Sequence, residues 1–179
     1  MARATTKEIA KVAGVAEGTL YKHFERKEDL FLALFRARVP EELKEAISEH
    51  QAGTGSVRGN LKAIALAVMR HFDQFVPLSV AFFADTDSLV RLQAFLLETG
   101  SGPQRLYTDV AAYIEAEQAL GRLNSRVPPQ SGAALLIGPC WQFVFLRQFL
   151  GTNPLAVSNE QFVDGLVYGL IAGLAPAET

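Results

Sequence analysis

The chain of 179 residues contains one cysteine, Cys140, and three histidines. A single cysteine excludes a disulfide within the chain and indicates a reducing compartment. The histidines His23, His50 and His71 are far apart and show neither the spacing of a metal site nor the composition of a catalytic triad. The sequence also lacks a nucleophile motif and a phosphate-binding loop. It therefore favours a binding function over an enzyme and predicts no cofactor and no metal.

Charged residues are also few, at 20% of the chain, whereas 49% of the residues are hydrophobic and the mean hydropathy is +0.15. Two apolar stretches, residues 133–146 and 162–174, are each shorter than the roughly 20 residues of a membrane-spanning helix. We therefore expect them to be buried helices and expect no membrane partner. The sequence does not open with a basic and apolar leader, which argues against secretion.

The sequence lacks strand-like segments as well, since no stretch alternates apolar and polar residues over the length of a strand. Apolar residues recur instead at the three- and four-residue intervals of helices, over residues 61–75, 85–98, 104–120, 132–150 and 159–174. Proline suits the first turn of a helix, so we expect Pro77 to begin a separate short helix that ends near Ala84. These patterns predict an all-α fold.

The most informative segment of the chain is residues 5–35. Thr5 and Glu8 have the spacing of a capping box, which begins a helix, and Gly14 stands where that helix must end. A second short helix is expected at about residues 17–23. A helix, a tight turn and a second helix are the elements of a helix-turn-helix DNA-binding motif.

The second of these helices would present a polar face to a DNA groove. Gly18 lets the backbone approach DNA closely, and Thr19 carries a hydroxyl and a methyl group that suit a phosphate or a thymine. Lys22 can reach a phosphate or a guanine edge, while Tyr21 and His23 can donate to phosphate oxygens. The residues that we expect to contact DNA are Thr5, Thr6, Lys7, Glu17, Gly18, Thr19, Tyr21, Lys22, His23 and Lys27. An ordinary helical hairpin with a solvated polar face is the alternative interpretation.

The distribution of charge supports DNA binding although the net charge is −2. Residues 1–27 hold six lysines or arginines and three glutamates, a local charge of +3, which leaves −5 for the rest of the chain. A basic segment on an acidic body orients the basic segment toward phosphates.

This segment resembles the TetR family of transcriptional regulators. The run GTLYKHF, followed two residues later by KEDLF, is the most specific part of the resemblance. The matching residues are Thr6, Ile9, Ala10, Ala13, Gly14, Val15, Gly18, Thr19, Leu20, Tyr21, His23, Phe24, Lys27, Glu28 and Leu30. Ala16 and Arg26 depart from the family pattern, because family members often have helix-capping serine, threonine or asparagine at these positions.

The resemblance implies a helix-turn-helix DNA-binding domain, residues 1–38, attached to a larger helical ligand-binding and dimerisation domain, residues 39–179. Family members carry a whole helix before the equivalent of Thr5, whereas only Met1 to Ala4 precede it here. We therefore expect the first helix to be missing from this sequence and Met1 not to be the natural start.

The resemblance also implies a ligand-responsive regulator of the bacterial cytoplasm. It is expected to be a repressor that binds a palindromic operator as a homodimer and is released by a small apolar effector. Two recognition helices on a two-fold axis would read half-sites about 34–36 Å apart. The alternative is a helical ligand-binding or scaffold dimer without DNA binding.

The last predicted helix repeats glycine every four residues. Glycine inside a helix costs about 1 kcal/mol, so a close approach of another helix is the expected reason for it. In TetR-like proteins the last two helices pair with their copies, so helices 132–150 and 159–174 are assigned to the dimer interface. The residues expected there are Phe162, Gly165, Leu166, Gly169 and Gly173. Close packing within one subunit is the alternative.

Aromatic residues are concentrated on the middle helices, where an aromatic interior with a few polar groups suits a small apolar ligand. The residues that we expect to contact the ligand are His71, Phe72, Phe75, Phe83, Arg91, Tyr107, Trp141 and Phe145. Aromatic side chains at helical spacing are also common in an ordinary core, and this alternative stays open.

Overall fold

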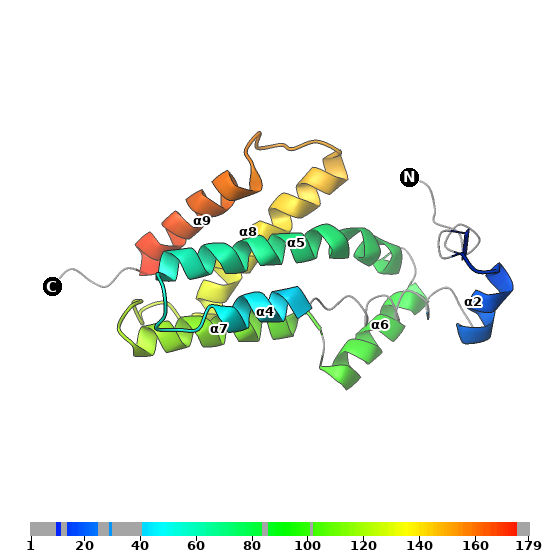
Figure 1. Ribbon diagram of the computed structural model, residues 1–179, viewed down its shortest axis with the longest axis horizontal. Coiled ribbons are helices and arrows are strands. Elements are labelled where there is room, and N and C mark those ends of the chain that lie inside the picture. The colour runs from blue at the N-terminus through cyan, green and yellow to red at the C-terminus, as the bar shows by residue number, and fades with distance from the viewer. Residues whose placement is uncertain are drawn as a thin grey trace.

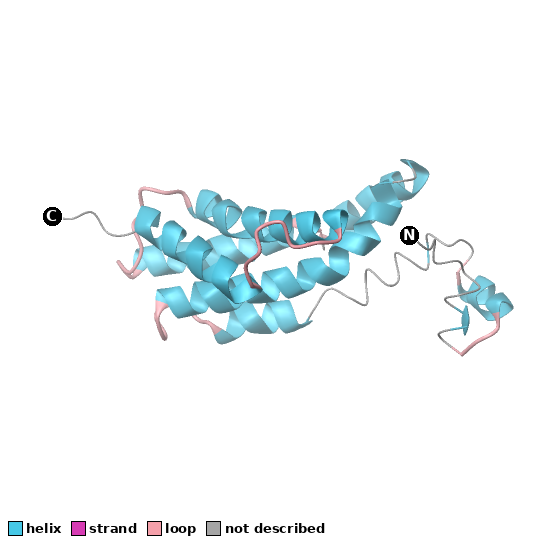
Figure 2. Cartoon of the chain, turned by 90° about the horizontal axis from the view of Figure 1, so that it is seen from above, coloured by secondary structure: helices cyan, strands magenta, loops and turns pink. Residues whose placement is uncertain are grey.

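The computed structural model describes residues 10–11, 14–24, 29, 41–83, 86–100 and 102–174 of the chain. All regular secondary structure in these ranges is helical, which confirms the predicted all-α fold (Figure 1, Figure 2). The helices are α2 (Glu17–His23), α4 (Glu41–Glu49), α5 (Val57–Phe83), α6 (Thr86–Thr99), α7 (Gln104–Ala119), α8 (Pro129–Leu150) and α9 (Asn159–Leu174).

The body of the molecule is built around α5, a helix of 27 residues. α8 and α9 pack along it, and α4 contacts both α5 and α7 (Figure 1). The centre of the core consists of aliphatic side chains without solvent exposure, namely Leu61, Ile64, Val68, Val110, Ile114, Leu136, Ile137, Val144 and Val163. Burying one such side chain contributes about 1.5–3 kcal/mol, so this core is the main source of stability.

Pro77 lies inside α5, which is continuous from Val57 to Phe83, so the prediction that a separate helix begins at Pro77 is wrong. A proline has no backbone N–H and leaves the carbonyl four residues earlier without its helical partner. That carbonyl belongs to Asp73, and the side-chain amide of Gln148 on α8 donates to it at 3.0 Å. A neighbouring helix thus supplies the hydrogen bond that the proline removes.

Polar side chains join α5, α8 and α9 at the same place. Arg147 Nη2 lies 2.5 Å from Asp73 Oδ1, and Arg147 Nη1 donates to Asn159 Oδ1 at 2.9 Å. A second ion pair, between Lys62 Nζ and Asp164 Oδ1 at 2.7 Å, links α5 to α9. These contacts fix the register of the three helices.

α6 is attached to α5 through a small second cluster of apolar residues. Leu92 and Phe95 are buried in it, and Phe75 of α5 packs against them. The outer face of α6 leaves Val90 and Leu97 exposed, at 56% and 82%. α6 therefore buries one face only.

Local signals mark the ends of the C-terminal helices. Gly121 and Gly151 follow α7 and α8 with φ of 70° and 68°, the left-handed conformation that ends a helix. α9 begins with a capping box, because Ser158 Oγ accepts from the Gln161 N–H at 3.2 Å and Gln161 Oε1 accepts from the Ser158 N–H at 2.8 Å. α8 begins at Pro129, where a missing N–H has no consequence for the helix.

By length and composition alone α8 could cross a membrane, since it has 22 residues and an apolar window with a mean hydropathy of 1.3. α8 extends beyond both ends of residues 133–146, the apolar stretch that is visible in the sequence. The core helices of soluble proteins pass the same test, and 33% of the window is buried in this fold. The apolar character of α8 is therefore weak evidence for a membrane.

Candidate functional site

The turn before α2 is held by a glycine and two backbone hydrogen bonds. Gly14 has a φ of 69°, and its N–H donates to the Lys11 carbonyl at 3.3 Å. The Val15 N–H donates to the carbonyl of Ala10 at 3.0 Å, and Ala10 is buried. These two bonds form a Schellman motif, which ends a helix at a left-handed residue. The predicted role of Gly14 as a helix terminator is confirmed.

α2 covers Glu17–His23, the bounds that the sequence predicts, and lies at one end of the molecule (Figure 1). The side chains of Thr19, Tyr21, Lys22 and His23 are exposed. A Cβ atom added at Gly18 would meet no described residue within 4 Å, and Gly18 is exposed, so the backbone is accessible there. The helix thus presents a polar and partly basic surface. The other predicted DNA contacts, Thr5, Thr6, Lys7 and Lys27, lie outside the described residues.

The predicted ligand residues of α5 lie close together. The ring centroid of His71 is 5.6 Å from those of both Phe72 and Phe75, and its ring is stacked on Phe75. Its Nδ1 atom is buried and has no hydrogen-bond partner among the described residues. Burial lowers the pKa of His71, so the ring is neutral near pH 7. A neutral ring can give or accept one hydrogen bond at the unpaired atom.

The predicted ligand residues of α8 belong to a second aromatic stack. Trp141 stacks on Phe145 with a centroid distance of 4.9 Å, and Phe145 stacks on Phe149 at 5.6 Å. Trp141 is 42% exposed and Phe149 is 70% exposed. The remaining predicted residues are partly or largely exposed and lie elsewhere, on α5, α6 and α7, namely Phe83, Arg91 and Tyr107. The structure therefore does not bring all eight predicted residues to one described groove.

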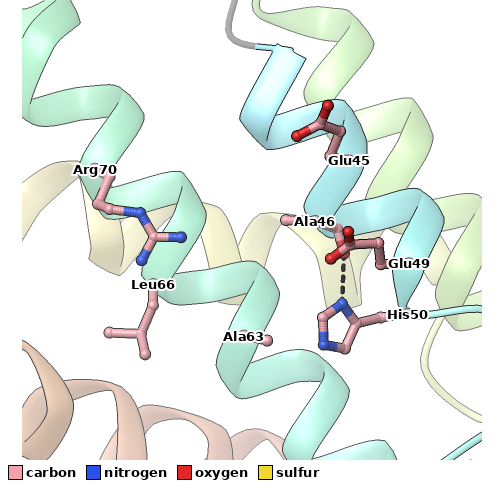
Figure 3. Close-up of a pocket in the computed structure, with 7 residues that line it drawn as sticks. All are labelled: Glu45, Ala46, Glu49, His50, Ala63, Leu66 and Arg70. Carbon is pink, nitrogen blue, oxygen red and sulfur yellow. Dashed lines mark hydrogen bonds between the residues drawn. The ribbon is translucent and has the colours of Figure 1, made fainter.

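A groove that the sequence did not reveal lies between α4 and α5 and has a volume of ≈ 490 Å³ (Figure 3). Charged and polar side chains line it together with small and apolar ones. The lining residues are Glu45, Ala46, Glu49, His50, Ala63, Leu66 and Arg70. On a short charged helix such as α4, glutamates at this spacing are typical of a solvated face, so nothing in the sequence indicated a groove here.

A second groove of ≈ 520 Å³ lies on the other side of α4, between α4 and α7. His50 lines both grooves, and its Nδ1 donates to the Ala46 carbonyl at 2.7 Å (Figure 3). Arg105 and Asp109 stand on the α7 side of the second groove, with Arg105 Nε 3.7 Å from Asp109 Oδ2. α4 is therefore flanked by a groove along each side.

Two glycines of α9, Gly165 and Gly169, face open space among the described residues of the protomer. A Cβ atom added at Gly165 or Gly169 would meet nothing within 4 Å. Close packing inside one subunit is therefore not the reason for these glycines. Phe162 stacks on Phe143 with a centroid distance of 4.4 Å and packs, like Leu166, against the core of its own protomer. The surroundings of Gly173 lie outside the described part of the chain.

The described residues contain no group of three His, Cys, Asp or Glu side chains that could hold a metal ion. Cys140 is fully buried, and burial raises its pKa to about 12. Because the thiolate is the reactive form of cysteine, this residue is unsuited to act as a nucleophile or a redox sensor.

Comparison with known proteins places the N-terminal segment in a family. Residues 1–34 match the family model described as "Bacterial regulatory proteins, tetR family". A fatty acid metabolism regulator protein of Bacillus subtilis is 35% identical over 68 residues, which cover 36% of this chain and 31% of that protein. The aligned segment thus spans less than a third of that relative.

The fold of the whole chain is similar to solved structures. A TetR-family transcriptional regulator from Mesorhizobium loti matches with a TM-score of 0.72 at 20% identity, over 94% of this chain and 85% of that chain. FadR from Bacillus subtilis, solved in complex with stearoyl-CoA, matches with a TM-score of 0.63 at 16% identity, over 95% and 88% of the two chains. Residues 1–34 thus match the tetR family of bacterial regulatory proteins in sequence, and the fold of the chain as a whole is similar to that of a solved TetR-family regulator.

Proposed function

We propose that the chain binds operator DNA as a homodimer through α2, and that a ligand in the helical body changes its affinity for DNA. The main support is the exposed polar face of α2, the helix that follows the Gly14 turn. A short helix held by a tight turn fits into the major groove, where base edges can be read. Residues 1–38 would form the DNA-binding domain and residues 39–179 the ligand-binding and dimerisation domain, in a protein of the bacterial cytoplasm.

Within this proposal the residues of α2 have distinct roles. Lys22 and Thr19 contact a phosphate or a base edge, while Gly18 allows the backbone to approach. Tyr21 and His23 donate to phosphate oxygens. The complete set of proposed DNA contacts is Thr5, Thr6, Lys7, Glu17, Gly18, Thr19, Tyr21, Lys22, His23 and Lys27.

We assign the dimer interface to the outer faces of α8 and α9. Gly165 and Gly169 leave room for a second helix to approach closely. The ladder of Trp141, Phe145 and Phe149 supplies exposed apolar surface on α8, and such patches on soluble proteins mark interaction sites. Trp141 and Phe145 are accordingly better placed to contact a partner protomer than a ligand.

We infer that the effector is an acyl compound such as an acyl-CoA. FadR of Bacillus subtilis was solved with stearoyl-CoA, and the aligned Bacillus subtilis relative is a fatty acid metabolism regulator. In this chain His71 offers an unpaired nitrogen beside the rings of Phe72 and Phe75, where an acyl carbonyl would find a donor among apolar groups. A coupling of about 1–3 kcal/mol between effector and operator binding would change operator affinity 5–150-fold, and a loss of affinity is the response expected of a repressor that its effector releases.

DNA binding is tested by selecting bound duplexes from a random pool at two salt concentrations. We expect an enriched palindrome and an affinity that falls steeply with salt, because phosphate contacts release counterions. Lys22→Ala should reduce the slope of log affinity against log salt by about 0.9 for each phosphate that Lys22 neutralises. Arg126→Ala, which removes an exposed cation from the loop before α8, is the matched control and should leave the slope unchanged.

The two outcomes of the selection separate two functions. Enrichment that depends on Lys22 establishes the regulator. A folded dimer that enriches no duplex would instead be a helical ligand-binding dimer without DNA binding.

The effector is tested by adding stearoyl-CoA to the protein–operator complex. We expect the complex to dissociate, whereas CoA alone should leave it intact. His71→Phe should keep DNA binding and weaken the response to stearoyl-CoA. A response of equal strength in His71→Phe would remove His71 from the ligand site.

A further inference from the structure

One turn of α5, which we call the proline turn and which consists of residues 73–77, is closed by α8 rather than by its own backbone. Pro77 has no N–H to offer the Asp73 carbonyl. The side-chain amide of Gln148 donates to that carbonyl at 3.0 Å and to Asp73 Oδ1 at 3.3 Å. In an uninterrupted helix the bond runs between two backbone groups and holds the turn by itself. Here the shape of the turn depends on a side chain of another helix.

The proline turn carries one of the aromatic rings of the candidate ligand site. Phe75 stacks on His71, one turn earlier in α5, with a centroid distance of 5.6 Å. On its other contacts Phe75 packs against Leu92 and Phe95 of α6 and against the main core. Protein interiors are close-packed and transmit strain, so a displacement of this ring strains the turn that carries it.

Arg147 of α8 connects the same turn to α9. Its Nη2 atom pairs with Asp73 Oδ1 at 2.5 Å, and its Nη1 atom donates at 2.9 Å to Oδ1 of Asn159, the first residue of α9. The guanidinium carbon lies 5.7 Å from the centroid of the Phe143 ring, which stacks in turn on Phe162 of α9. Arg147 thus holds the start of α9 in a position that depends on Asp73.

The aromatic contacts and the Arg147 contacts lie on different sides of the proline turn. Successive residues of an α-helix are rotated by about 100°, so Asp73 and Phe75 point about 200° apart around the axis of α5. His71 lies on the side of Phe75, because residues four apart share a face. The backbone of the turn is therefore what joins the aromatic side to Arg147.

We propose that the proline turn couples the position of the Phe75 ring to the position of α9, with Arg147 as the positioning residue. When the ring shifts, the turn changes shape, because Pro77 removes the backbone bond that would resist the change. Asp73 then moves Arg147 and the start of α9 with it.

The consequence for regulation rests on the proposed function. A ligand beside His71 and Phe75 would move α9, which carries the proposed dimer interface, and so change the separation of the two DNA-binding domains. The coupling within one protomer does not rest on that function and is tested separately.

This coupling is tested by urea unfolding of Phe75→Leu, Arg147→Gln and the double variant, all at one protomer concentration. Independent sites have additive effects on stability, whereas linked sites do not. We expect the unfolding constant of the double variant to differ from the additive value by at least about twofold. The same cycle in the Pro77→Ala background should be additive, because the restored N–H closes the turn without α8. Alanine favours a helix, so this background should fold.

Lys62→Gln is the matched control. Lys62 also joins α5 to α9 by an ion pair, with Asp164 at 2.7 Å, but is remote from Phe75 along the helix. Its effect should therefore be additive with that of Phe75→Leu. Additive effects of Phe75→Leu and Arg147→Gln in the parent, or undiminished coupling in Pro77→Ala, would overturn the proposal. Equal coupling of Phe75 to Lys62 would overturn it as well, because Phe75 would then act on α9 through the whole core.

The consequence for regulation is measured with stearoyl-CoA, on a duplex selected with the parent protein. By calorimetry Pro77→Ala should bind stearoyl-CoA as tightly as the parent does. The factor by which stearoyl-CoA weakens operator binding should nevertheless be at least about fivefold smaller in Pro77→Ala. An unchanged factor would show that the ligand acts on DNA binding without the proline turn. A parent that binds no stearoyl-CoA or no duplex contradicts the proposed function, and the unfolding cycles then decide the coupling alone.

Discussion

At the scale of the residue, the burial of His71 makes the stability of the protein depend on pH. Folding lowers its pKa, so the unfolded chain takes up this proton first as the pH falls. The free energy of unfolding should therefore be highest above the ordinary pKa of 6.5, decrease as the pH falls through that value, and level off below the folded pKa. Urea unfolding between about pH 8 and pH 5 measures this slope, and His71→Phe should make it shallower. Equal slopes in the two proteins would show that His71 does not titrate differently on folding.

At the scale of the element, the stability of α5 around Pro77 depends on a hydrogen-bond donor from α8. Gln148→Leu should destabilise the protein by about 1 kcal/mol, because the Asp73 carbonyl then loses its partner while Pro77 cannot replace it. Pro77→Ala restores the backbone N–H, so the same Gln148→Leu substitution should cost much less in that background. A double-mutant cycle of urea unfolding measures the difference. Additive effects of the two substitutions would contradict this account of α5.

The same scale shows which elements could be predicted from the sequence. The bounds of α2 and α9 were predictable because the signals at their ends, Gly14 and Ser158, act on neighbouring residues. The continuity of α5 across Pro77 could not be predicted, since the side-chain amide of Gln148, which replaces the missing backbone donor, is remote in sequence. The exposed polar face of α2 followed from residue type alone. The burial of Glu117 on α7 could not be predicted, because this residue stands in a polar stretch and its carboxylate accepts from Gly53, which is remote in sequence.

At the scale of the whole molecule, the open face of α9 predicts how the protomers associate. If the proposed homodimer forms through α9, Gly169→Arg should yield a folded monomer, because a side chain there meets no described residue of its own protomer but would collide with a second α9 helix. The helix itself should gain about 1 kcal/mol, since glycine is unfavourable in its interior. Sedimentation velocity measures the change, with Ala119→Arg at the exposed end of α7 as the control. A Gly169→Arg protein that remains a dimer would move the interface elsewhere.

The bond from Gln148 to the Asp73 carbonyl also constrains the order in which this sequence can diverge. If position 77 first regains a residue with an N–H, the glutamine becomes dispensable and position 148 can drift to an apolar residue at little cost. If position 148 changes first, the carbonyl is left unpaired and the intermediate is less stable. The same two mutations are therefore accessible in one order and selected against in the other.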